Sequence, residues 1–128
     1  MIKIPKPKVR NLLNLGELYE TIATLYNNNN SGDDNFVMFD HFTIYKTRRL
    51  FRVISIKPDI LVSFKLSRIS DKYYFNIVAG SDWGNAREFY STQEEVIDID
   101  DFKEELKRHE DIVEEFTTVT KEIMEVIK

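Results

Sequence analysis

The chain has 128 residues, no cysteine and a formal net charge of −4, with 42% hydrophobic and 31% charged residues. This composition excludes disulfide-stabilised folds and thiolate metal sites, and it is too apolar for a wholly disordered chain. No apolar run approaches the roughly 18 residues of a membrane span, and residues 1–8 lack the apolar centre of a secretory signal. We therefore expect a cytoplasmic protein that contacts no membrane.

The N-terminal third predicts an arm, a helix and a loop. Lysine alternates with proline over residues 3–8, which favours an extended basic arm over residues 1–10. Asn14 with Glu17 three residues later is typical of a helix start, and apolar residues recur at steps of three and four. We expect a helix over about residues 11–26, and then an asparagine-rich loop up to residue 35.

From Phe36 the apolar period changes to two, which predicts β-strands. The alternating segments are 36–44, 50–56, 62–66, 73–78 and, less regularly, 87–91. Short turns separate them, at Pro58-Asp59 and at residues 70–72, so consecutive strands pair in an antiparallel meander of four to five strands. A polar loop over residues 80–85 contains Trp83.

The C-terminal segment predicts one long amphipathic helix beginning at Asp100 or Asp101. Its stripe follows alternating steps of four and three. The stripe has two interpretations: a core helix that packs on its own sheet, or a seam that pairs with the same helix of a second copy to form a homodimer. The stripe is wider than a strict seam, so the two interpretations are compatible. The candidate partner interface is Phe102, Leu106, His109, Val113, Phe116, Ile123 and Ile127. The expected fold is a single α+β domain over residues 11–128.

Motifs for catalysis are absent from the sequence. The four glycines are spaced wrongly for a nucleotide-binding loop, and the two histidines, His41 and His109, are far apart. The acids of residues 98–105 do not match a calcium loop and are typical of a helix N-terminus. We expect a non-catalytic protein without a cofactor or a metal.

Charge is distributed unevenly along the chain. Residues 1–87 have 13 basic and 8 acidic residues (+5), whereas residues 88–128 have 5 basic and 14 acidic residues (−9). Lysines, arginines and aromatic rings are the groups that bind single-stranded nucleic acid. If Leu50, Ile54 and Ile56 face the core, the opposite sheet face is basic and aromatic. The candidate nucleic-acid-binding residues are Lys3, Lys6, Lys8, Arg10, Tyr45, Arg49, Phe51, Lys57, Lys65, Tyr74 and Trp83.

A rival hypothesis is a protein–protein interaction module. The acidic C-terminal helix would steer a small regulator or inhibitor onto a basic protein partner. The acids involved would be Glu104, Glu105, Glu110, Asp111, Glu114 and Glu115. A strand meander followed by a dimerising helix also resembles, in layout alone, the single-stranded-DNA-binding transcriptional coactivators, a resemblance that implies the first hypothesis.

Overall fold

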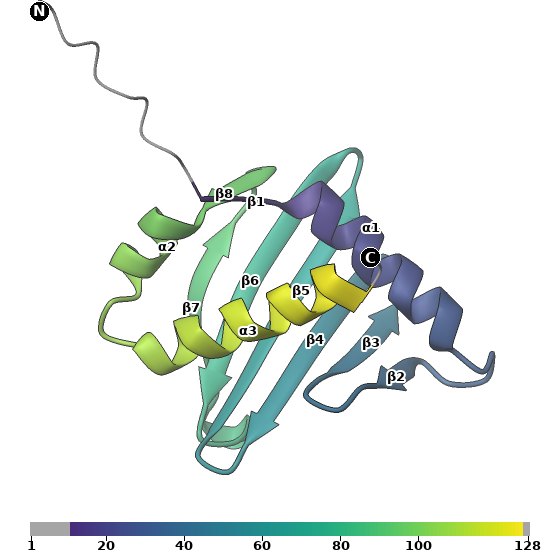
Figure 1. Cartoon of the computed structure of the whole chain (residues 1–128), viewed down its shortest axis with the longest axis horizontal. Helices are drawn as coiled ribbons and strands as arrows, with labels where there is room; N and C mark the ends of the chain where they lie inside the picture. The colour runs from purple at the N-terminus through teal and green to yellow at the C-terminus, as the bar shows by residue number, and fades with distance from the viewer. Residues whose placement is uncertain (1–10, 127–128) are drawn as a thin grey trace, which may run out of the picture.

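A computed structural model describes residues 11–126 of the chain. Its centre is a six-stranded antiparallel sheet in which every strand pairs with its neighbours in sequence (Figure 1). The strands of this sheet are β2 (Phe36–Met38), β3 (Thr43–Thr47), β4 (Leu50–Lys57), β5 (Ile60–Ile69), β6 (Lys72–Gly80) and β7 (Arg87–Thr92). The predicted α+β fold, with an N-terminal helix, an antiparallel meander and C-terminal helical structure, is confirmed.

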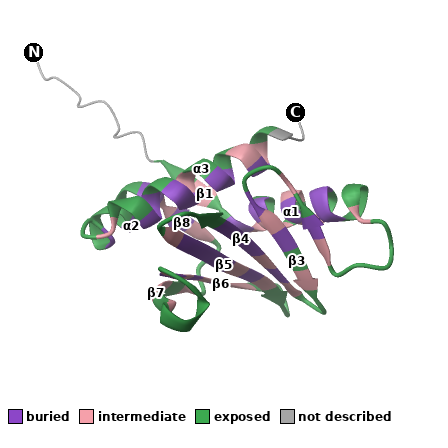
Figure 2. Ribbon diagram, turned by 90° about the horizontal axis from the view of Figure 1, so that it is seen from below, coloured by how far each residue is buried: buried purple, intermediate pink, exposed green. Residues whose placement is uncertain are grey.

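Three helices gather on one side of the sheet (Figures 1 and 2). They are α1 (Leu15–Asn29), α2 (Ile99–Glu105) and α3 (Glu110–Val126). The predicted cap of α1 is confirmed, because Asn14 Oδ1 accepts a hydrogen bond of 2.9 Å from the Glu17 N–H. The predicted start at about residue 11 is wrong, because Leu12–Asn14 form a strand, β1. The helix continues three residues beyond the predicted end. No helix of residues 11–126 is long and apolar enough to cross a membrane.

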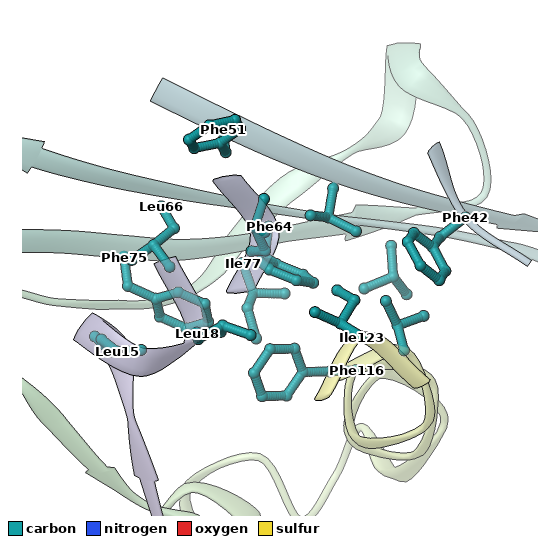
Figure 3. Close-up of a cluster of buried hydrophobic side chains, with 14 of the residues drawn as sticks. Leu15, Leu18, Phe42, Phe51, Phe64, Leu66, Phe75, Ile77, Phe116 and Ile123 are labelled. Carbon is teal, nitrogen blue, oxygen red and sulfur yellow. The ribbon is translucent and has the colours of Figure 1, made fainter. Parts of the chain in front are cut away.

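The core lies between the sheet and the helices, where Figure 3 shows the packed side chains. Alternation along each strand puts Phe51 and Val53 of β4, Phe64 of β5 and Phe75 of β6 on the same face. Phe116 of α3 enters this cluster, with its ring centroid 5.2 Å from Phe64 and 5.5 Å from Phe75. We call this the covered face of the sheet and its reverse the open face.

A second, two-stranded sheet brings the start of the described chain next to the segment that follows β7. Strand β1 (Leu12–Asn14) pairs antiparallel with β8 (Val96–Asp98), and α1 and α2 begin directly after these strands. Two backbone bonds of 2.8 Å extend the pairing, from Leu15 N to Glu95 O and from Ile99 N to Asn11 O. Sequence periodicity missed both strands because three residues are too short for a period to be seen.

The prediction of one long C-terminal helix starting at Asp100 or Asp101 is wrong in its bounds. Asp98 caps α2, and the helix stops at Leu106 before α3 begins. The aromatic packing explains the break, because the rings of Phe102 and Phe116 lie 5.2 Å apart. In one straight helix these residues would be about 21 Å apart along the axis, at about 1.5 Å per residue.

The strand predictions were right in period and incomplete in number. The segment 36–44 is two strands, because the chain turns where Phe39 N donates to Phe42 O. The turn between β3 and β4 contains Arg48 and Arg49, with Arg48 at a φ of 37°. Such turns normally contain glycine or asparagine, so the sequence gives no sign of it. The predicted basic arm, residues 1–10, lies outside the described residues.

Candidate functional site

The open face presents one continuous row of side chains across five strands. The backbone register pairs Phe36 with Tyr45, Tyr45 with Arg52, Arg52 with Lys65, and Lys65 with Asn76. We call these five residues the central row. Its first two rings are 5.8 Å apart between centroids. The row therefore passes from an aromatic end, through two cations, to an amide.

The two cations of the central row have an unusual arrangement. Arg52 and Lys65 are directly opposite each other on neighbouring strands, a placement that destabilises a sheet when both charges have the same sign. Within residues 11–126 neither makes an ion pair. Two adjacent cations without a counter-charge are suited to bind an anion.

Trp83 lies next to this pair, on the loop that joins β6 to β7. The loop forms a single 3-10 turn, η1 (Trp83–Asn85), and folds back onto the open face. Gly80 allows this close approach, because a Cβ at that position would lie 2.5 Å from Asn85 O. The indole is 50% exposed, and the Arg52 guanidinium carbon lies 6.0 Å from its ring centroid. Trp83 is therefore both held against the sheet and available to a ligand.

A recess of about 370 Å³ separates Trp83 from the aromatic end of the central row. Tyr45, Arg52, Ile54 and Trp83 line it. Tyr45 is 37% exposed, so two aromatic faces and a guanidinium are accessible at one place. In proteins that bind single strands, aromatic rings stack on the bases and neighbouring cations bind the phosphates.

Four of the predicted nucleic-acid-binding residues lie on the open face: Tyr45, Lys65, Tyr74 and Trp83. Arg49 is exposed at the tip of the β3–β4 hairpin, near one end of this face. Lys3, Lys6, Lys8 and Arg10 lie outside the described residues.

The predictions for Phe51 and Lys57 are wrong, because β4 has the opposite register to the one assumed. Phe51 is 2% exposed and packs against Tyr19 and Tyr26 of α1. Lys57 lies on the covered side and bonds to α3. Leu50, Ile54 and Ile56 instead lie on the open face, where Ile56 is 69% exposed. Arg52, which this register brings into the central row, is the site residue that sequence reasoning missed.

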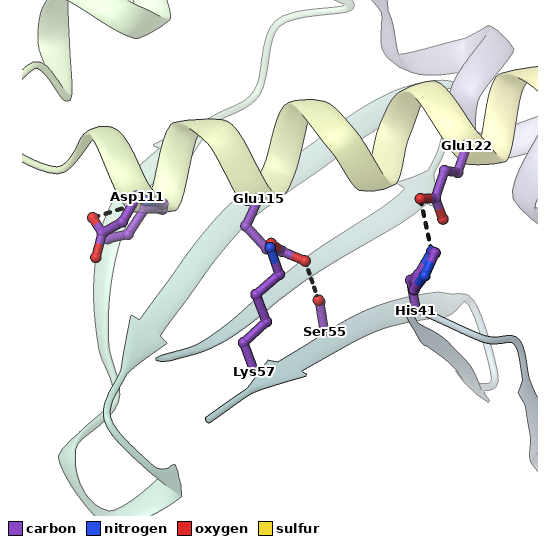
Figure 4. Close-up of polar contacts among 7 residues, drawn as sticks. His41, Ser55, Lys57, Asp111, Glu115 and Glu122 are labelled. Carbon is purple, nitrogen blue, oxygen red and sulfur yellow. Dashed lines mark hydrogen bonds and ion pairs between the residues drawn. The ribbon is translucent and has the colours of Figure 1, made fainter. Parts of the chain in front are cut away.

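A polar cluster at the end of β4 connects α3 to the sheet through a hydrogen bond and ion pairs (Figure 4). Glu115 of α3 is 3% exposed, accepts a hydrogen bond from the Ser55 hydroxyl, and pairs with Lys57 Nζ at 2.5 Å. This bond and the charge of Glu115 raise the pKa of Lys57 above its usual 10.5. Nearby, His41 Nδ1 lies 2.9 Å from a Glu122 carboxylate oxygen. The polar and charged groups of these side chains pair with one another, so the cluster stabilises the packing of α3 on the sheet.

The predicted partner stripe is part of the core. Its members Phe102, Leu106, Val113, Phe116 and Ile123 are each at most 8% exposed within their own chain. His109 packs against the ring of Phe89, with 4.5 Å between centroids. The core-helix interpretation is therefore the right one, and these side chains are not free to form a seam. Ile127 lies outside the described residues.

An excess of acidic residues lies on the side of the molecule opposite the open face. The exposed residues of α2, α3 and the turn between them include eight acids and four bases. This layer lies on the covered side, away from Arg52 and Lys65. The acidic segment therefore does not neutralise the basic face. One predicted member of the acidic interface is excluded, because Glu115 is buried and already paired.

Comparison with known proteins gives no match: no protein-family model, no curated protein and no solved structure matches this chain.

Proposed function

We propose that this protein is a non-catalytic binding protein that holds single-stranded nucleic acid on the open face of its sheet. The observation that supports this most is the pair of opposed cations, Arg52 and Lys65, flanked by the exposed rings of Tyr45 and Trp83. A phosphate between the two cations would remove their repulsion, and the rings would stack on neighbouring bases.

The hairpin tip supports the same proposal. Arg48 adopts a positive φ that a glycine or asparagine would adopt at lower cost, and Arg49 follows it. A strained backbone conformation that keeps two arginines exposed is typical of a functional position. The tip would extend the phosphate-binding surface beyond the central row.

A single strand fits this surface better than a duplex does. The central row crosses a sheet, and its rings are useful only to bases whose faces are free to stack. A duplex presents a phosphate backbone to such a surface and hides its base faces. The protein should therefore prefer single strands at equal length and salt.

Charge reversal on the two faces tests the proposal. Fluorescence anisotropy would measure the affinity for labelled single strands between about 50 and 300 mM salt. Replacing Arg52 and Lys65 by glutamate should weaken binding by at least tenfold at the low end of this range. Because each phosphate contact contributes about −0.7 to the slope of log affinity against log salt, the slope should also shrink by about 1.4.

The matched control reverses two lysines of the acidic helical layer, Lys103→Glu and Lys121→Glu, which changes the net charge by the same amount. Both control residues are exposed. The affinity of this control double variant for single strands should stay within twofold of that of the parent protein. Equal losses in the two double variants would mean that only net charge matters, and no binding by the parent protein at low salt would refute the proposal.

The rival function, docking of the acidic helices on a basic protein, is supported by the eight exposed acids of α2, α3 and their connecting turn. Reversing Glu110 and Glu114 would slow association with such a partner. The same variant should leave single-strand affinity unchanged or slightly higher, which separates the two functions.

A further inference from the structure

A polar recess of about 180 Å³ lies at the amide end of the central row, beyond the two cations. Its volume equals that of about six water molecules in the liquid, which is comparable to a single pyrimidine base. The polar residues that line it include Lys65, Ser67, Asn76, Ser91 and Gln93, and Tyr74 contributes a ring. The recess is thus unlike the aromatic and aliphatic one beside Trp83.

Asn76 has a fixed orientation within this recess. Its amide Nδ2 donates a hydrogen bond of 3.0 Å to a carboxylate oxygen of Glu88, so the amide oxygen is the atom left over. That oxygen is buried and has no hydrogen-bond partner among residues 11–126. A buried acceptor without a donor destabilises a protein, and a ligand that supplies the donor recovers that free energy.

Lys65 supplies the complementary group. It lies directly opposite Asn76 on β5, lines the same recess and has no ion-pair partner within the described chain, so no salt bridge restrains its side chain. The recess then offers one recessed acceptor beside one movable cationic donor. Its ligand should present a projecting donor next to an acceptor.

We propose that this recess binds the Watson–Crick edge of one base of the bound strand and prefers a base with an exocyclic amino group. The inference rests on the proposed single-strand binding and adds a base preference to it. In cytosine the projecting N4 amino group donates to Asn76 Oδ1, and ring N3 accepts from Lys65 Nζ. Uracil has a carbonyl oxygen in place of that amino group and an N–H at ring position 3. It would therefore face Asn76 Oδ1 oxygen against oxygen and would offer Lys65 Nζ no acceptor at N3.

The first test compares oligo(dC) with oligo(dU) of equal length, because the two differ at the amino group and at the proton on ring N3, and neither has a methyl group. Anisotropy titrations of the unmodified protein should give an affinity at least about fivefold higher for oligo(dC), since one neutral hydrogen bond alone contributes about that factor. Homopolymers are suitable because every register of the strand then places the same base in the recess. This measurement needs no variant and so does not depend on one that folds.

The second test uses Asn76→Leu, which keeps the size of the side chain and removes the acceptor. The ratio of the two affinities should fall by about fivefold, the contribution of the Asn76 contact, while the affinity for oligo(dU) stays within twofold of that of the unmodified protein. Asn35→Leu is the matched control, since Asn35 lines the recess beside Trp83 at the other end of the face. This control should leave the ratio of the two affinities unchanged from that of the unmodified protein.

The outcomes separate the two proposals. Equal binding of oligo(dC) and oligo(dU) by the unmodified protein overturns the base preference and leaves single-strand binding intact. A ratio that survives in Asn76→Leu also overturns it, because the preference would then arise elsewhere. Absence of binding to either oligonucleotide overturns the proposed function itself.

Discussion

The opposed cations of the open face predict a measurable instability of the free protein. Arg52 and Lys65 are directly opposite across β4 and β5, so their Cβ atoms are about 5 Å apart. Two unit charges about 6 Å apart in water repel each other by about 0.7 kcal/mol. Side-chain movement reduces this value and partial burial increases it, so we expect a coupling free energy of about 0.5 kcal/mol.

A double-mutant cycle isolates that repulsion from the other contacts of each residue. Urea unfolding would give the free energy of unfolding for the parent protein, Arg52→Gln, Lys65→Gln and the double variant. Either single substitution removes the whole repulsion. The change in the free energy of unfolding of the double variant should therefore be about 0.5 kcal/mol less favourable than the sum of the changes in the two single variants. The cycle also removes the separate effect of losing the Arg52–Trp83 contact.

Salt dependence and a control pair complete the test. In about 1 M salt the Debye length is about 3 Å, so the coupling should fall toward zero. Lys65→Gln combined with Lys72→Gln is the control, because Lys72 lies opposite Ile69 and the two changes should add. Additive effects of Arg52→Gln and Lys65→Gln at low salt, or a coupling that salt does not change, would refute the electrostatic argument.

Three further predictions concern the scaffold. Phe116→Ala should lower the free energy of unfolding by about 3–5 kcal/mol in urea titrations, since the ring is 1% exposed among three other rings. Glu115 raises the pKa of Lys57, so this pairing stabilises the fold fully below pH 10.5, and the stabilisation is lost as the pH rises through the raised pKa. In alkaline unfolding experiments, the difference in the free energy of unfolding between the parent protein and Lys57→Met should therefore shrink. Asn14→Ala should cost about 1 kcal/mol by removing the cap of α1, with Asn28→Ala, an exposed substitution in the same helix, as the control.

The sequence predicted those elements whose signal is local. The cap at Asn14 is encoded within four residues, and β5 and β6 alternate clearly between apolar and polar side chains. These patterns placed Tyr45, Lys65 and Tyr74 on the correct face. The burial of the C-terminal stripe also followed from its period, as one of two stated alternatives.

The register of β4 could not be read in the same way, because both of its faces are apolar. Leu50, Ile54 and Ile56 compete with Phe51 and Val53, and local hydrophobicity does not decide between them. The decision lies in tertiary contacts. On the face that packs against the helices, Ser55 donates a hydrogen bond to the buried Glu115 of α3 and Lys57 neutralises its charge. The same register places the ring of Phe51 against α1.

Two other features depend on contacts between distant residues. The break between α2 and α3 lies within an uninterrupted apolar stripe, and only the packing of Phe102 on Phe116 shows that the helix must turn. The position of Trp83 depends on the space left by Gly80, at the end of β6. The ring of Tyr45, which Trp83 faces across the recess, lies three strands earlier, on β3. The residue types of the site could be predicted from the sequence, but their convergence in space could not.

Fluorescence of Trp83 tests the central claim most directly, because it is the only tryptophan of the chain and lies at the proposed site. Titration with an unlabelled single strand should quench its emission through base stacking. The quenching should saturate at the concentration given by anisotropy and weaken as salt rises. Binding detected by anisotropy with unchanged tryptophan emission would contradict the account, because the strand would then lie somewhere other than the open face.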